Sequence, residues 1–166
     1  LPADFPYPIV IVQHMPPGFT RSLATRLDKA SELTVKEAEE GDVLKKGIVY
    51  VAPGDHHLGA KYENGNAKLF LDNKTGKINN VRPSVDYTLD KIVEIYKNRT
   101  IAVILTGMGR DGTKGAFKVK FYGGTVIAEA EETCVVFGMP KSVIDEGYAD
   151  YILPAYKIPE KLVELV

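Results

Sequence analysis

The sequence contains few of the features that mark several common protein classes. It has a single cysteine, Cys134, so no internal disulfide can form. Its apolar runs fall well short of the ~20 residues that a helix needs to cross a bilayer, and residues 1–8 lack the basic and apolar regions of a secretory signal. The 21 basic and 22 acidic residues leave a net charge of -1, whereas nucleic-acid partners favour a basic surface. We therefore expect no nucleic-acid partner, no membrane insertion and no signal peptide.

What the sequence does contain is an alternation of strands and helices. Continuous β-branched runs at residues 8–12 and 100–105 are typical of strands covered on both faces, as in a parallel sheet. Apolar residues recur with helical spacing in two other segments, residues 19–29 and 84–96. The remaining elements are an expected hairpin with a turn at Asn64-Gly65, and further strands and helices. In chain order, helices are expected at 19–29, 84–96, 113–122, 139–146 and from Pro159, and strands at 34–38, 47–52, 57–62, 67–71, 125–128 and 150–153. This order predicts an α/β fold: a doubly wound, mostly parallel sheet with helices on both faces and an antiparallel β-hairpin insertion.

Polar residues follow the two most apolar strands. His14 comes directly after the strand at 8–12, and Asp111 lies in the glycine-rich loop at 106–112 that follows the strand at 100–105. Because the carboxyl ends of parallel strands converge in a crevice, these residues are candidates for the base and the orienting group of a nucleophile–base–orienter relay. The simpler interpretation is that His14 ends a strand and Asp111 caps the following helix. Position alone leaves both interpretations open.

The glycine-rich loop also permits more than one interpretation. Gly107, Gly109 and Gly112 allow close backbone approach, so the loop could cradle a phosphate. It lacks the Lys-Ser/Thr pair of a P-loop and the glycine spacing of the dinucleotide fingerprint. Alternatively, the loop aims Asp111 at His14 and turns an N–H toward an oxyanion, or it is a plain turn.

Two other candidates are weaker. Asp55-His56-His57 contains metal-ligating residue types, but adjacent histidines on a strand point to opposite faces, so we expect a solvated turn and no metal. Cys134 precedes the apolar residues 135–137 and has no basic neighbour in sequence. We therefore expect an inert thiol in preference to a nucleophile.

Four motifs occur in a distinctive order. They are Gln-His-Met-Pro-Pro-Gly-Phe-Thr at 13–20, Arg-Pro-Ser-Val-Asp at 82–86, Leu-Thr-Gly-Met-Gly-Arg-Asp-Gly at 105–112 and Cys-Val-Val-Phe-Gly-Met-Pro at 134–140. A fifth, Tyr-Val-Ala-Pro-Gly-Asp-His-His at 50–57, lies between the first two. In combination they resemble the catalytic domain of the chemotaxis protein-glutamate methylesterases, the CheB family. The resemblance covers essentially the whole chain.

The resemblance implies a serine-type hydrolase without a cofactor. It would remove methyl groups from γ-glutamyl methyl esters, and in many members deamidate glutamines, on the cytoplasmic helices of bacterial chemoreceptors, resetting chemotactic adaptation. By the same resemblance His14 matches the catalytic base, Asp111 matches the orienting aspartate and Met108 matches a residue beside the oxyanion site. The implied partners are the methylated receptor helices and the receiver domain of the same parent protein, in the cytoplasm.

The family's nucleophile has no match in this sequence. It is a serine in a Ser-Thr-Gly-Gly-like turn, which residues 1–166 do not contain. We expect that serine upstream of Leu1, and we expect residues 1–166 to be a single catalytic domain that lacks its first strand–helix unit and the upstream receiver domain. The alternative is a non-catalytic, receptor-binding fragment.

Overall fold

A computed structural model describes all 166 residues and divides them into two compact units, Leu1–Thr88 with Val166, and Leu89–Leu165. The strands are β1 (Ile9–Ile11), β2 (Thr34–Glu37), β3 (Ile48–Val51), β4 (His57–Glu63), β5 (Asn66–Asp72), β6 (Ile101–Ile104), β7 (Thr125–Glu129) and β8 (Tyr151–Leu153). The α-helices are α1 (Phe19–Ala30), α2 (Val85–Tyr96), α3 (Thr113–Phe121), α4 (Met139–Asp145) and α5 (Ile158–Glu164). Short 3-10 turns lie at η1 (Lys97–Arg99), η2 (Glu131–Thr133) and η3 (Ala155–Lys157).

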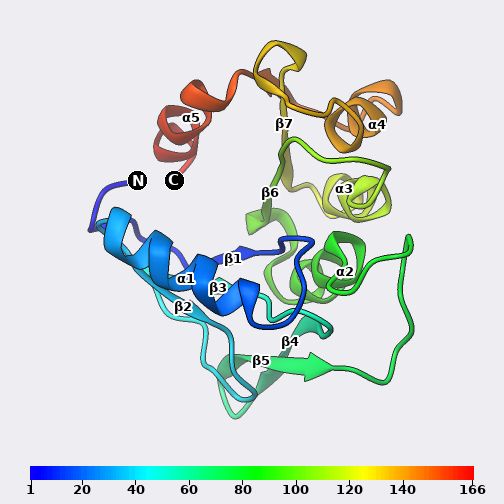
Figure 1. Cartoon of the computed structure of the whole chain (residues 1–166). Coiled ribbons are helices and arrows are strands. Elements are labelled where there is room, and N and C mark those ends of the chain that lie inside the picture. The colour runs from blue at the N-terminus through cyan, green and yellow to red at the C-terminus, as the bar shows by residue number, and fades with distance from the viewer. The chain divides into compact units, whose positions relative to one another are not determined.

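The first unit is built on a parallel sheet with the order β1-β3-β2 (Figure 1). Ile11 of β1 is paired with Val51 of β3, so the carboxyl ends of these two strands lie at the same edge. Helix α1 packs on β2 and β3 and places Leu23 and Leu27 against the buried core. That core consists of Phe5, Ala24, Leu33, Val35, Val49 and Val51.

Strands β4 and β5 form an antiparallel hairpin in the same unit. Its tip is Asn64-Gly65, where both residues have a positive φ, 50° and 78°. Asn-Gly is the pair that a tight hairpin turn of this kind favours, because both central residues must adopt the left-handed region. The hairpin insertion is therefore confirmed.

The second unit is built on a parallel sheet with the order β6-β7-β8. Ile104 is paired with Ala128, and Glu129 with Leu153, so all three strands end at one edge. Helices α3 and α4 both pack on β6 and β7. The side chains buried between them include Ala116, Val119, Val126, Ile127 and Val143.

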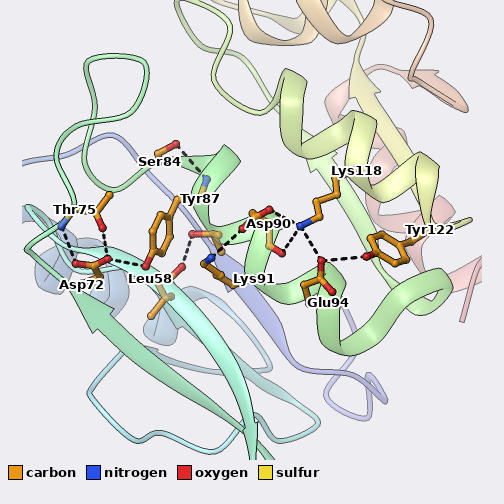
Figure 2. Close-up of polar contacts among 11 residues, drawn as sticks. Leu58, Asp72, Thr75, Ser84, Tyr87, Asp90, Lys91, Glu94, Lys118 and Tyr122 are labelled. Atoms are coloured by element: carbon orange, nitrogen blue, oxygen red, sulfur yellow. Dashed lines mark hydrogen bonds and ion pairs between the residues drawn. The ribbon is translucent and has the colours of Figure 1, made fainter.

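Helix α2 makes polar contacts in each unit (Figure 2). Within the first unit, the Thr88 hydroxyl donates to the carbonyl oxygen of Leu58 at 2.7 Å. Within the second, the Lys118 ammonium lies 2.9 Å from the Glu94 carboxylate, and the Tyr122 hydroxyl donates to Glu94 at 3.1 Å. The hydrogen bond from Lys118 is the main reason why the pKa of Glu94 falls to about 2.

The expected α/β class is confirmed, with parallel strands, helices that pack on them and an antiparallel hairpin. The parallel strands fall into two three-stranded sheets, one in each unit. The single catalytic domain remains a prediction. None of the helices combines the length and the apolar character that crossing a membrane requires.

Candidate functional site

In the first unit, His14 lies on the loop that leaves the carboxyl end of β1. The N–H of Ala52 donates to the carbonyl oxygen of Ile11 at 2.8 Å, so the chain leaving β3 runs beside the end of β1. A Cβ added at Gly54 would lie 2.4 Å from the Pro17 nitrogen and 2.5 Å from the Pro16 carbonyl carbon. The backbone of the loop that carries His14 therefore rests directly on Gly54, where no side chain fits.

Gly54 is itself held by a buried hydroxyl. Its N–H donates to the Thr20 Oγ1 at 3.0 Å, and the Thr20 hydroxyl donates to a Glu37 carboxylate oxygen at 3.0 Å. Thr20 is fully buried in the first turn of α1, and Glu37 is the last residue of β2. The loop of His14 thus begins at the end of β1 and rests on Gly54. Gly54 is in turn bonded to Thr20 of α1, which is bonded to Glu37 of β2. The His14 side chain is half-buried.

In the second unit, a buried carboxylate organises the loops at the strand ends. Glu129, the last residue of β7, is only 3% exposed. One of its oxygens accepts the Thr106 N–H at 2.7 Å, and the other accepts the Thr133 hydroxyl at 2.9 Å. The Thr106 hydroxyl oxygen in turn accepts the N–H groups of Val135 at 3.0 Å and Val136 at 2.9 Å. Glu129 and Thr106 therefore join the loop after β6 to the segment after β7.

The same two segments also touch main chain to main chain. The Gly107 N–H donates to the Val136 carbonyl at 3.0 Å, and the Gly107 carbonyl accepts the N–H groups of Met139 at 2.8 Å and Gly138 at 3.2 Å. A Cβ at Gly138 would lie 2.7 Å from the Gly107 oxygen. This close approach of the backbone is the physical reason for glycine at position 138.

Met108 and Asp111 occupy the loop that these contacts hold. Met108 is 84% exposed, whereas Asp111 is 2% exposed. Helix α3 has Gly112 at its N-cap position with φ 98°, so Asp111 precedes the cap residue. At this far end of the loop, the Thr113 hydroxyl donates to the Ser142 oxygen at 2.9 Å, which anchors the start of α3 on α4.

The structure thus places the predicted site residues on loops at the carboxyl ends of parallel strands. Met108 and Asp111 lie together on one loop of the second unit, and His14 lies in the first unit. The pairing of His14 with Asp111 stays a prediction. Sequence reasoning missed Gly54 and Glu129 as supporting residues. Glu129 did carry a signal, because a carboxylate that directly ends an apolar strand is the same pattern that singled out His14.

The Asp55-His56-His57 segment differs from the expected solvated turn. His57 is fully buried, its Nε2 lies 2.8 Å from the Gly76 carbonyl oxygen, and its ring stacks on Tyr87 with centroids 4.6 Å apart. The expectation was therefore wrong for His57, because a partner 19 residues away along the chain allows the imidazole to be buried. Asp55 is paired with Arg82 at 2.6 Å. The structure contains no group of three or more His, Cys, Asp or Glu side chains arranged to bind a metal ion.

The structure disfavours both a nucleophilic Cys134 and a phosphate site at the glycine-rich loop. Burial is the main factor that raises the pKa of the half-buried Cys134 thiol, and the nearby Glu129 carboxylate raises it further, so the thiolate is disfavoured. A phosphate cradle at the glycine-rich loop needs free N–H groups and no negative charge. The Thr106 and Gly107 N–H groups are already bonded, the first of them to the Glu129 carboxylate.

Comparison with known proteins agrees with this architecture. A family model described as "CheB methylesterase" matches residues 1–162. The chain is 77% identical to the Thermotoga maritima protein named "Protein-glutamate methylesterase/protein-glutamine glutaminase", over 100% of this chain and 48% of that protein. It is 48% identical to a Pyrococcus horikoshii protein of the same name, over 99% of this chain and 45% of that protein.

A solved structure is also similar. It is described as the crystal structure of the Thermotoga maritima CheB methylesterase catalytic domain, and the match has a TM-score of 0.98 at 77% identity. The match covers 100% of this chain and 87% of the crystallised one. The architecture is thus that of an α/β domain whose loops gather at the carboxyl ends of parallel strands. The chain belongs to the CheB methylesterase family. It spans about half the length of the curated relatives that it matches.

Proposed function

We propose that the protein to which this chain belongs is a protein-glutamate methylesterase. Its substrates are γ-glutamyl methyl esters on the cytoplasmic helices of chemoreceptors, and it also deamidates receptor glutamines. It acts in the cytoplasm, alongside a receiver domain of the same parent protein. Removal of the methyl groups resets chemotactic adaptation.

In the proposed mechanism, a serine of the parent protein outside residues 1–166 attacks the ester carbonyl while His14 takes the hydroxyl proton. The tetrahedral oxyanion forms beside Met108, and methanol leaves with the proton that His14 returns. Water then attacks the acyl-enzyme and gives one proton to His14. His14 passes this proton to the leaving serine oxygen, so that glutamate is released and the serine hydroxyl is restored. Asp111 orients the imidazole and stabilises its charged form.

One observation carries this proposal: the family match over residues 1–162 includes both strand-end loops, and each of those loops is fixed by contacts of its own. The curated relatives bear the name of the same activity. A buried aspartate directly before a helix N-cap suits an orienting group, because burial protects its interaction with an imidazole from solvent screening.

The test is methanol release from methylated receptor membranes by the full-length protein and its His14→Ala variant. We expect the variant to lose at least about 10⁴-fold in rate, because the serine then lacks its base. Lys29→Ala is the control, since it removes an exposed side chain of the same unit. An unchanged rate for His14→Ala contradicts the proposal. Receptor binding by a wild-type protein that releases no methanol supports the receptor-binding module in its place.

A further inference from the structure

We propose that Glu129 is a positioning residue for ester hydrolysis, acting through Thr106 on the loop that carries Met108 and Asp111. This inference rests on the proposed function. Glu129 does not belong to any of the five motifs that resemble the family. Its role follows from its burial and from the contacts of its two carboxylate oxygens.

The Glu129 carboxylate is buried at the end of β7. A carboxylate that is 3% exposed is unfavourable unless hydrogen bonds compensate it. Glu129 has one partner on each oxygen, the Thr106 N–H at 2.7 Å and the Thr133 hydroxyl at 2.9 Å. A bond from a backbone N–H to a carboxylate is charge-assisted and stronger than a neutral one. Glu129 therefore holds the first residue of the loop more firmly than a neutral acceptor would.

Thr106 extends this hydrogen-bond network to the segment after β7. Its hydroxyl accepts two backbone N–H groups, those of Val135 and Val136, and it donates to the Val136 carbonyl at 3.2 Å. Gly107, the next residue, bonds to the backbone of Val136, Gly138 and Met139. The beginning of the loop is thus fixed by a network whose one buried charge is Glu129.

The loop that carries Met108 and Asp111 is anchored at both of its ends. The Met108 side chain is 84% exposed and so contributes little packing. Gly109 and Gly112 adopt positive φ angles, 89° and 98°, and Gly109 has no Cβ that could pack. The two ends of the loop therefore help to set the position of the segment between them. Glu129 and Thr106 hold one end, and the contact between Thr113 and Ser142 holds the other.

The experiment compares kcat and KM for methanol release by the full-length protein and three variants. For Glu129→Ala we expect kcat to fall by about 10²-fold, with KM changed far less, because a misplacement of about 1 Å costs a rate of that order. Glu129→Gln should restore most of kcat, because the amide oxygen still accepts the Thr106 N–H. Glu132→Ala removes an exposed carboxylate of the neighbouring turn and should match the wild type.

A double-mutant cycle separates positioning from general loss of structure. If Glu129 acts through the loop of Asp111, Glu129→Ala should have little further effect in an Asp111→Ala background, because both changes remove the same interaction. The inference is overturned if the kcat losses of Glu129→Ala and Asp111→Ala multiply in the double variant. It is also overturned if Glu129→Ala keeps the wild-type kcat. A wild-type protein that releases no methanol refutes the proposed function itself. If circular dichroism shows that Glu129→Ala is unfolded, Thr106→Val and Thr106→Ser replace it as the test. The inference then requires that Thr106→Val lowers kcat and that Thr106→Ser keeps kcat near the wild-type value.

Discussion

Replacing Gly54 by alanine tests how the loop that carries His14 is held. The new Cβ would lie 2.4 Å from the Pro17 nitrogen and 2.5 Å from the Pro16 carbonyl carbon, both of which are backbone atoms that no rotamer change can move. An ordinary contact begins near 3.4 Å, so the loop must shift by about 1 Å. A shift of that size typically costs about 10²-fold in turnover. Overpacking of this kind also costs about 1–3 kcal/mol of stability.

The assay has two readouts on the full-length protein. Thermal unfolding should show a Tm lowered by about 2–12 °C, which is what this loss of stability produces in a domain of 150–250 residues. Methanol release below that temperature should show the fall in kcat. The matched control is Gly76→Ala, because a Cβ at Gly76 meets nothing within 4 Å. The reasoning is refuted if Gly54→Ala and Gly76→Ala have the same kcat and the same Tm.

Two further predictions concern charge. The pKa of Glu94 falls from an ordinary value of 4.5 to about 2, chiefly through its hydrogen bond from Lys118. A lowered carboxyl pKa stabilises the fold above pH 4.5, and this contribution disappears as the pH drops toward 2. In denaturant titrations Glu94→Gln should flatten the stability profile in that window, and an unchanged slope contradicts the assignment. Cys134→Ala should keep its methanol release, and native Cys134 should react slowly with iodoacetamide at pH 7, because its pKa is raised; inactivation of the variant would identify the thiol as functional.

Local sequence patterns were sufficient for most of the fold. The β-branched runs at 8–12 and 100–105 correspond to β1 and β6, and the Asn64-Gly65 turn lies at the tip of the β4–β5 hairpin. These features depend on neighbouring residues, so the sequence displays them directly. The arrangement of the parallel strands in two sheets depends on pairings between distant segments. Periodicity contains no information about those pairings.

The same distinction applies to the site. His14 and Asp111 could be selected because polar residues at the ends of buried parallel strands are conspicuous in a sequence. The burial of His57 could not be predicted, since it requires the carbonyl of Gly76 and the ring of Tyr87. The importance of Gly54 also could not be predicted, because its contact with Pro16 and Pro17 crosses a large sequence separation.

The proposed function requires His14 and Asp111 to act as one unit in ester hydrolysis. The most direct test is methanol release from methylated receptors by the full-length His14→Ala, Asp111→Ala and doubly substituted proteins. Removing the orienting carboxylate should cost about 10⁴-fold in turnover. Residues that act as a unit are strongly non-additive, so the double variant should be no slower than His14→Ala alone. If the two losses multiply in the double variant, the residues act independently and the account is contradicted.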